Sequence, residues 1–416
     1  MRLEELNHWW KEKRVKEEFI PITKRQLFHE IKKDLERKQI QVIVGLRRVG
    51  KSTIFFQLID ELIKNNVNPK NIIYCSFDEP ELREKRIEEI LREYSKITGV
   101  DYKNEKIYLF LDEVQKSKNW IDSTKLIYDN LPNVKILISG SASLNILAEA
   151  KRSLAGRAIY YHLKPLSFKE YLEFKGMKIE EREILIYKET LEREFENFLW
   201  RSFPEIVNET DKTFIKNYIR NSIIEPVILK DLPKEFKNVD IDLVENLVNI
   251  FFKEPGQYLD VENLSKELRR GKKTIYQTLF YMEFSFLIKR IFNFRPSVRL
   301  SSRKLQKVYA FHHSLLLPFD VSEDRLIENL VAHELDVRYY WRDKTKEVDF
   351  LKDFIPVEVK FREKVKDEDL RWVKEFLEKY GKLLNVSKGY IITKNDEGKM
   401  NNIELIPIWL FSFRGI

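Results

Sequence analysis

The sequence is poor in cysteine, glycine, proline and long hydrophobic runs, and each shortage excludes something. A single cysteine, Cys75, excludes a disulfide framework and fits a reducing cytoplasm. No apolar run approaches the length of a membrane span, and residues 1–18 are too charged for a secretory signal, so we expect no membrane partner. With only 12 glycines and 13 prolines in 416 residues, the loops should be short and helix abundant.

The abundant residues are those of a large globular protein. Hydrophobic residues make up 43% of the chain and aromatic residues 13%, enough for real cores, and 416 residues predict two to four domains. Charged residues make up 34% and leave a net charge of +8. Lysine and glutamate dominate them and isoleucine is frequent, a composition that suggests a hyperthermophile.

The strongest motif lies near the start, where "GLRRVGKST" follows the apolar run "IQVIVG" and precedes the helix-like "IFFQLIDELI". Gly45 and Gly50 permit the backbone angles that let successive N–H groups converge on one anion. Lys51 adds a charge for the β- and γ-phosphates, the Ser52 hydroxyl suits Mg²⁺, and the following helix directs its positive end to the same place. The motif predicts an ATP phosphate loop made of Gly45, Leu46, Arg47, Arg48, Val49, Gly50, Lys51, Ser52 and Thr53.

Two further apolar runs end in polar residues. The first, "KIYLFLDEVQ", is typical of a strand buried on both faces of a parallel sheet and ends at Asp112 and Glu113. Because ligands lie at the carboxyl ends of such strands, we expect Asp112 to hold Mg²⁺ through water and Glu113 to polarise the attacking water. The second, "VKILISGSAS", ends in Ser139, Ser141 and Ser143. We take Ser141 as the candidate γ-phosphate sensor; alternatively, these serines only cap the next helix.

These blocks resemble the AAA+ ATPases, and in particular an archaeal and bacterial family that joins an AAA+ core to a nuclease-like carboxyl-terminal domain. The resemblance rests on "GLRRVGKST", "YLFLDEVQ", "ILISGSAS" and the more specific "LAGRAIYYHLKPLSFKEYL", and it extends over nearly the whole chain. It implies an α/β P-loop fold with ATP and Mg²⁺ as ligands. It also implies that Arg157 is a sensor or finger arginine, directed at its own γ-phosphate or at a neighbour's in an oligomer; an ordinary surface arginine is the alternative.

The pattern of periodicity divides the chain into five predicted parts. A helical extension precedes the ATPase core, and a lid with inward aromatic stripes separates the core from two smaller modules. The parts are residues 1–20 (helical extension), 21–165 (AAA+ P-loop core), 166–240 (helical lid), 241–318 (winged helix) and 319–416 (small α/β nuclease-like domain).

Residues 241–312 have the order helix, turn, helix and strand that is typical of a winged helix. Thirteen lysines and arginines against seven acids give this stretch a net charge of +6, the footprint of a nucleic-acid binder. We therefore expect DNA at the start of the second helix, with interdomain packing as the alternative role of the module. The candidate DNA-binding residues are Lys272, Lys273, Thr274 and Gln277. The histidine pair at positions 312 and 313 is expected at the surface.

The last hundred residues carry a different acidic pattern. In "PVEVKF", Glu358 and Lys360 face one side of a strand, Asp349 lies in the preceding strand, and Glu328 lies in a helix upstream. Two carboxylates that hold a metal beside a lysine are what a Mg²⁺-dependent phosphodiesterase of the restriction-endonuclease type requires. The motif resembles the Holliday-junction-resolvase branch of that fold. It predicts a second metal site at Glu328, Asp349 and Glu358 beside Lys360, although such pairs also occur on solvated strands and related domains often lack activity.

Together these features predict a Mg²⁺-dependent ATPase that acts on DNA or is regulated by it. A function of another class competes with this interpretation: a nucleotide-gated switch or scaffold that recruits a protein partner and cuts nothing. ATP turnover that DNA stimulates would favour the first, and slow turnover indifferent to DNA would favour the second.

Overall fold

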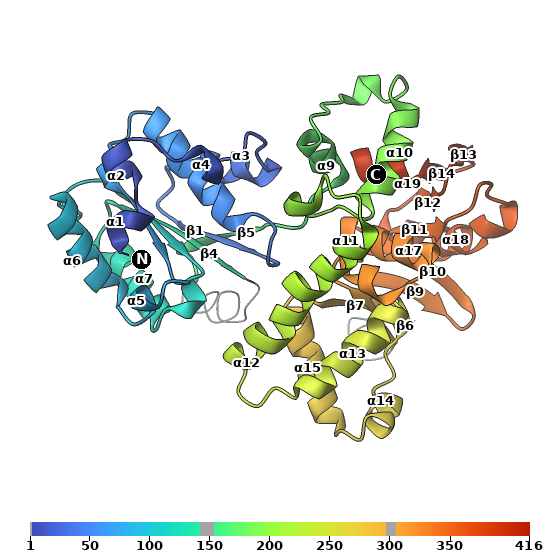
Figure 1. Cartoon of the computed structure of the whole chain (residues 1–416). Coiled ribbons are helices and arrows are strands. Elements are labelled where there is room, and N and C mark those ends of the chain that lie inside the picture. Colours follow the sequence, from blue (N-terminus) through green and yellow to red (C-terminus); the bar gives the residue numbers. More distant parts are fainter. Residues whose placement is uncertain (1, 142–153, 297–304) are drawn as a thin grey trace. The chain divides into compact units, whose positions relative to one another are not determined.

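The computed structural model describes residues 2–141, 154–296 and 305–416. The chain divides into two compact units, Met1–Pro165 and Leu166–Ile416 (Figure 1). Residues 166–240, which the sequence predicts as a lid, belong to the second unit.

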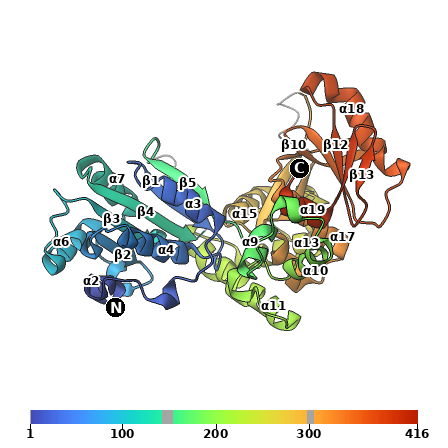
Figure 2. The ribbon, with the colours of Figure 1, turned by 90° about the horizontal axis from the view of Figure 1, so that it is seen from above.

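A five-stranded parallel sheet is the centre of the first unit (Figure 2). Its order is β2-β3-β4-β1-β5, so the strand before the phosphate loop lies between β4 and β5. Both β1 and β3 are buried along their whole length, as expected of strands covered on both faces. This arrangement confirms the predicted α/β parallel-sheet core. The strands are β1 Ile40–Gly45, β2 Ile72–Ser76, β3 Ile107–Asp112, β4 Val134–Ser141 and β5 Ala158–His162.

Helices connect these strands and cover the sheet. The longest, α4, follows the phosphate loop and buries an apolar face that includes Ile54, Phe55 and Leu58. The helices are α1 Leu3–Leu6, α2 Trp9–Glu12, α3 Gln26–Lys33, α4 Lys51–Lys64, α5 Pro80–Arg83, α6 Ile87–Thr98 and α7 Trp120–Asn130, with 3-10 turns at Glu17–Phe19, Pro69–Asn71 and Val114–Lys116.

The helical extension at the start of the chain covers the free edge of β2. The Asn7 side chain donates to the Tyr74 carbonyl at 2.9 Å and accepts from the Tyr74 N–H at 2.6 Å, as a neighbouring strand would. The indole N–H groups of Trp9 and Trp10 both donate to the Ile72 carbonyl. Side chains therefore satisfy backbone groups that an exposed edge strand would leave unpaired.

A nine-stranded mixed sheet is the framework of the second unit. Its order is β13-β14-β12-β11-β10-β9-β7-β8-β6, and the parallel pair β7–β9 joins the strands of the predicted winged helix to those of the predicted nuclease-like domain. The strands are β6 Gln257–Tyr258, β7 Ile288–Asn293, β8 Gln306–Ala310, β9 Tyr339–Asp343, β10 Lys346–Lys352, β11 Ile355–Lys360, β12 Gly389–Thr393, β13 Gly398–Met400 and β14 Ile403–Pro407.

Ten α-helices are assigned in the part of this unit that the structure describes. They are α9 Phe168–Phe174, α10 Lys188–Phe198, α11 Lys212–Ile219, α12 Leu232–Glu235, α13 Ile241–Lys253, α14 Val261–Glu267, α15 Lys272–Phe284, α17 Glu323–Glu334, α18 Arg371–Leu384 and α19 Ile408–Arg414. 3-10 helices lie at Glu181–Glu183, Pro204–Ile206, His313–Phe319 and Asp367–Leu370, and π-helical turns at Arg220–Ile224 and Val227–Asp231.

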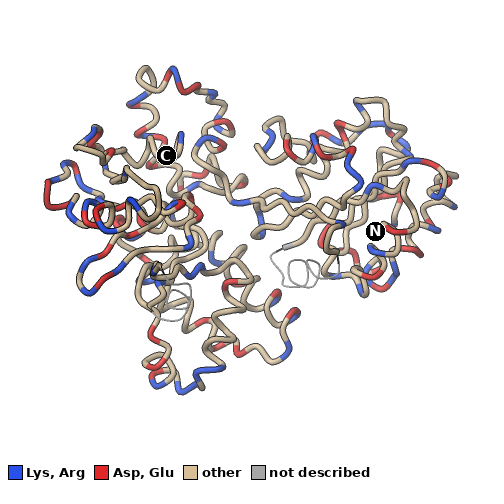
Figure 3. The backbone as a smooth tube through the Cα atoms, turned by 180° about the vertical axis from the view of Figure 1, so that it is seen from behind, with Lys and Arg blue, Asp and Glu red and all other residues tan. Residues whose placement is uncertain are grey.

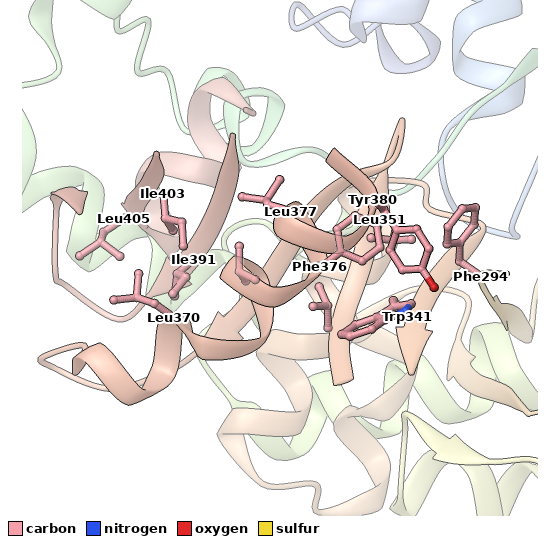
Figure 4. Close-up of a cluster of buried hydrophobic side chains, with 12 residues drawn as sticks. Phe294, Trp341, Leu351, Leu370, Phe376, Leu377, Tyr380, Ile391, Ile403 and Leu405 are labelled. Carbon is pink, nitrogen blue, oxygen red and sulfur yellow. The ribbon is translucent and has the colours of Figure 1, made fainter. Parts of the chain in front are cut away.

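Aromatic side chains pack these helices together. The Phe168 ring contacts the rings of Phe195, Phe198 and Phe413, so the aromatic stripes of residues 166–200 join α9 and α10 to the last helix, α19. A second cluster lies where α18 covers β9, β10, β12 and β14 (Figure 4); Trp341 and Phe376 are fully buried at its centre. Both clusters are hydrophobic core.

Candidate functional site

The phosphate loop connects β1 to α4 in a geometry that only certain residues allow. Gly50 has a φ of +96° and Arg48 a φ of +65°, both left-handed, so the loop turns back on itself before the helix begins. The side chains of Leu46 and Val49 are fully buried, so they fix the loop to the core of the first unit. Because α4 begins at Lys51, its first N–H groups have no partner within the helix and are available to an anion.

The Lys51 ammonium lies within the loop and is only 6% exposed. It donates to the carbonyls of Gly45 at 3.2 Å and Leu46 at 2.9 Å. The positive charge that the motif predicts for the β- and γ-phosphates is therefore held by the backbone of the phosphate loop itself.

The Asp112 carboxylate is buried among hydroxyl groups. Its Oδ2 accepts from Ser52 Oγ at 2.6 Å and from the Tyr74 hydroxyl at 2.7 Å. Its Oδ1 accepts from Ser139 Oγ and from the Glu113 N–H at 3.1 Å. A carboxylate that is 3% exposed needs such donors to satisfy its oxygens. Asp112 thus lies directly against the serine of the phosphate loop.

The run "VKILISGSAS" contains three candidate serines. Of these, Ser139 is the one whose hydroxyl donates to Asp112. Ser141, the predicted sensor, closes β4 opposite Gly45 in the sheet register. Ser143 lies outside the described residues. Tyr74, which sequence reasoning missed, reaches Asp112 from the adjacent strand β2. Burial, followed by the Asp112 charge, raises the pKa of Tyr74 well above its ordinary value, so the phenol remains a donor.

Glu113 follows Asp112 with a left-handed φ of +51°. Its Oε2 accepts from Gln115 Nε2 at 2.7 Å and lies 3.7 Å from the Lys116 ammonium. The two neighbouring acids therefore have separate sets of side-chain donors, as their predicted roles require.

Arg25 is a second contributor that the sequence did not reveal. Its guanidinium is 5% exposed and donates to the Val49 carbonyl in the phosphate loop at 2.7 Å. It also donates to the carbonyls of Lys164 at 2.7 Å and Pro165 at 3.3 Å. One side chain thus joins the loop to the last residues of the first unit.

Arg157 does not lie beside this loop. It precedes β5, and its carbonyl accepts from the N–H of Ile40, the first residue of β1. The loop follows the last residue of β1, five residues and roughly 17 Å away at the rise of a strand. The Arg157 guanidinium pairs with Asp129 at 2.9 and 3.2 Å. The register of β5 against β1 therefore places Arg157 at the end of the strands opposite to the phosphate loop, which does not favour a contact with a γ-phosphate bound at that loop.

The second predicted site brings Asp349, Glu358 and Lys360 together on β10 and β11. Glu358 Oε2 accepts from the Asp349 N–H at 3.2 Å, and its Oε1 lies 2.6 Å from Lys360 Nζ. Asp349 Oδ2 accepts from the Val359 N–H at 2.9 Å. Burial, followed by the Asp349 charge, raises the pKa of Glu358 to about 8.

Glu328 approaches the same cluster from α17. Its Oε1 accepts from the Tyr309 hydroxyl at 2.6 Å and lies 3.9 Å from the buried ammonium of Lys307. Burial, followed by Asp349, raises the pKa of Glu328. Within the described ranges, however, no group of three His, Cys, Asp or Glu side chains is placed to hold a metal ion. The expected three-carboxylate metal site is thus not assembled there.

The predicted DNA-binding residues lie at the start of α15. Lys272, Lys273 and Gln277 are exposed and Thr274 is half-buried. Arg269 and Arg270 lie at the preceding turn, and Figure 3 shows several basic positions where α14 meets α15. Two of these cations are paired, Arg270 with Asp240 and Lys272 with Glu262. The predicted core beneath them has Leu264 and Ile275 buried and Leu268 half-buried.

The expectation that His312 and His313 are surface residues is wrong. Both are at most 1% exposed, and His313 Nε2 lies 3.2 Å from Ser202 Oγ. Burial lowers the pKa of His313 to about 3. The partner of Nε2 lies more than one hundred residues away in the sequence, so no local pattern predicts that this ring is buried.

Comparisons with known families match three separate parts of the chain. Residues 37–172 match an AAA domain, residues 192–320 match a domain of unknown function (DUF8612), and residues 323–411 match another (DUF4143). The AAA match contains the phosphate loop, Asp112 and Ser139.

An uncharacterized protein of Methanocaldococcus jannaschii is 31% identical to this chain over 414 residues, which cover 92% of this chain and 91% of that protein. This chain belongs to its family. Another uncharacterized M. jannaschii protein is 28% identical over 72% of this chain and 68% of its own length. An uncharacterized Haemophilus influenzae protein is 24% identical over 89% of this chain and 94% of its own length. Proteins similar to this chain thus occur in both an archaeon and a bacterium.

Among solved structures, the Aeropyrum pernix ORC1 protein in complex with DNA is similar at 12% identity and a TM-score of 0.34, covering 73% of this chain and 93% of that one. Thermotoga maritima RuvB is similar at 17% identity and a TM-score of 0.32, covering 67% and 93%. Scores this low support no argument about function. The P-loop assignment rests on the AAA match and the sheet. In the described part of the chain, no helix combines the length and apolar character needed to cross a membrane.

Proposed function

We propose that this protein hydrolyses ATP with Mg²⁺ at the phosphate loop, and that its nucleotide state controls contact with DNA through residues 241–416. The observation that carries the first part is the contact between Ser52 Oγ and Asp112 Oδ2 at 2.6 Å. It joins the hydroxyl of the phosphate loop to the acid of the neighbouring motif across 60 residues of sequence.

Ser52 Oγ and Asp112 Oδ2 fit a magnesium ion, which prefers oxygen ligands and keeps several waters. Ser52 would hold it directly and Asp112 through water; when bound, Mg²⁺ neutralises charge on the phosphate oxygens. The loop N–H groups and Lys51 orient the phosphates. Glu113 accepts a hydrogen bond from the attacking water and directs it at the γ-phosphate, while Ser139 fixes Asp112.

Arg25 supports a link between nucleotide state and the rest of the chain. Its guanidinium binds the Val49 carbonyl and the carbonyls of Lys164 and Pro165. If nucleotide binding displaced the loop, Arg25 would therefore shift the backbone of Lys164 and Pro165, where the chain leaves the first unit. Such a connection is what nucleotide-controlled display of the second unit needs.

The element order α13-β6-α14-α15-β7-β8 supports a winged helix with α15 as its recognition helix. The exposed Lys272 and Lys273 at its start are suited to phosphate contacts. An open groove of about 750 Å³ beside it has tyrosine and basic side chains in its lining, Tyr258, Tyr276, Arg295, Arg342 and Lys344, together with the acids Asp260 and Glu262. Aromatic and basic residues together are typical of nucleic-acid contacts.

The order α17-β9-β10-β11-α18-β12, with β11 and β12 parallel, supports the nuclease-like fold for the following residues. It says nothing of cleavage, because fold alone does not carry activity.

The test is steady-state ATP turnover in Mg²⁺ with and without DNA, at several salt concentrations. We expect DNA to raise turnover at low salt and to lose this effect as salt rises. Lys51→Ala should abolish ATP binding without unfolding the protein. Lys273→Ala combined with Gln277→Ala should reduce the DNA-dependent increase, whereas Lys382→Ala on the exposed face of α18 should leave it intact. Slow turnover that no DNA changes would instead favour a switch that recruits a protein partner.

A further inference from the structure

A lysine lies beside Glu328, one of the carboxylates of the second unit for which the sequence predicts a divalent cation. Lys307 on β8 is only 5% exposed, and lysine is almost never buried unless it is paired. Its ammonium lies 2.5 Å from Glu347 and 3.9 Å from Glu328. A full positive charge is therefore held between the carboxylates of β10 and α17.

Other groups around Lys307 favour the same charge. The rings of Tyr258 and Tyr340 lie 5.8 and 5.4 Å from its Nζ, within the range of cation–π attraction. Burial alone lowers the pKa of Lys307, but Asp349, together with the two glutamates, raises it overall above its ordinary value. The ammonium is thus stabilised by acids and aromatic rings together.

The rest of the cluster is compensated in a similar way. Lys360 pairs with Glu358, whose other oxygen accepts the Asp349 N–H, and Asp349 in turn accepts the Val359 N–H. Arg342 lies 3.8 Å from Glu347. Each of these carboxylates has a cation or an N–H donor beside it. A divalent ion would have to displace those partners and approach two ammonium groups.

We propose that Lys307 is the internal cation of this cluster and takes the place that a divalent metal ion would need. The carboxylates of β10 and α17 are then held together by lysine and do not bind Mg²⁺, so this module contacts DNA without metal-dependent cleavage. The DNA contact rests on the proposed function, whereas the charge balance stands without it.

The experiment is a calorimetric titration of the nucleotide-free, full-length protein with MnCl₂, alongside thermal unfolding with and without Mn²⁺. The variants are Lys307→Met and, as a control, Lys346→Met, which removes a lysine on β10 that is paired with Glu375 on α18. We expect no binding by the parent or the control at millimolar Mn²⁺. Lys307→Met should gain a site, unfold at a lower temperature than the parent, and recover stability when Mn²⁺ is added.

Lys307→Arg keeps the positive charge and should behave as the parent does. If Lys307→Met does not fold, Lys307→Arg becomes the deciding variant. A folded Lys307→Arg protein that binds no Mn²⁺ supports the proposal, and one that binds Mn²⁺ overturns it. Two further results would overturn it: Mn²⁺ binding by the parent that Asp349→Asn removes, or a folded Lys307→Met with the parental unfolding temperature and no response to Mn²⁺. Absence of DNA binding by the parent would refute the proposed function and leave this inference standing.

Discussion

Gly45 is the position where the phosphate loop tolerates a side chain least. An ideally placed Cβ there would lie well inside the 3.0 Å that real Cβ atoms keep from the Leu163 carbonyl oxygen, and 3.3 Å from Val49 Cγ2. The Leu163 N–H also donates to the Val44 carbonyl at 2.8 Å, so a hydrogen bond holds the two segments together directly beside the clash. Because the obstruction is backbone, no rotamer change relieves it.

Gly45→Ala should therefore separate the loop from residues 163–165. Overpacking of this kind costs roughly 1–3 kcal/mol. For a unit of this size, that lowers the unfolding temperature by roughly 3 to 10 °C. The shift also moves the carbonyls that hold Lys51, so we expect ATP affinity to fall at least about tenfold, equivalent to roughly 1.4 kcal/mol.

Differential scanning calorimetry and an ATP-binding titration measure these two effects. Gly99→Ala is the matched control: Gly99 ends α6 with a φ of +77° and open space around its Cβ position, so that alanine strains the backbone without touching the loop. The control should lose some stability and keep parental ATP affinity. The reasoning is refuted if Gly45→Ala keeps both the parental unfolding temperature and the parental affinity.

Two further predictions concern buried polar groups. Tyr74→Phe removes a donor from a charged acceptor and should destabilise the first unit by about 1.5–3 kcal/mol. Tyr94→Phe, which removes a bond to the neutral Lys70 carbonyl, should cost less in denaturant unfolding; equal costs would contradict the assignment. His313 has a folded pKa of about 3, below its ordinary value, so between pH 6.5 and 5 the unfolded chain binds a proton that the folded chain does not. Stability should fall as pH falls through that window, by up to about 1.4 kcal/mol per unit. His313→Gln should make the slope shallower, and an unchanged slope would show that His313 is not its source.

The sequence predicts well what short motifs determine. The glycines, Lys51 and Ser52 are fixed within nine residues, and an apolar strand that ends in two acids identifies Asp112 and Glu113 without any knowledge of tertiary contacts. The alternation of β11 likewise brings Glu358 and Lys360 together. In each case the chemistry depends on spacing of a few residues.

What the sequence could not predict depends on contacts between distant segments. Tyr74 reaches Asp112 across 38 residues and Arg25 reaches Lys164 across 139. The position of Arg157 depends on the register of β5 against β1, and a strand pattern does not specify which end of a neighbour it meets. Lys307, on β8, enters a cluster of acids on other elements only because β6 to β14 form one sheet.

The central claim is that Glu113 activates water for ATP hydrolysis at this loop. Steady-state phosphate release in Mg²⁺, measured for the parent and Glu113→Gln together with ATP binding by both, tests it most directly. We predict that the variant binds ATP as the parent does, because Ser52, Asp112 and Lys51 are intact, while its turnover falls by about 100-fold or more. Parental turnover by a folded Glu113→Gln protein would contradict the account.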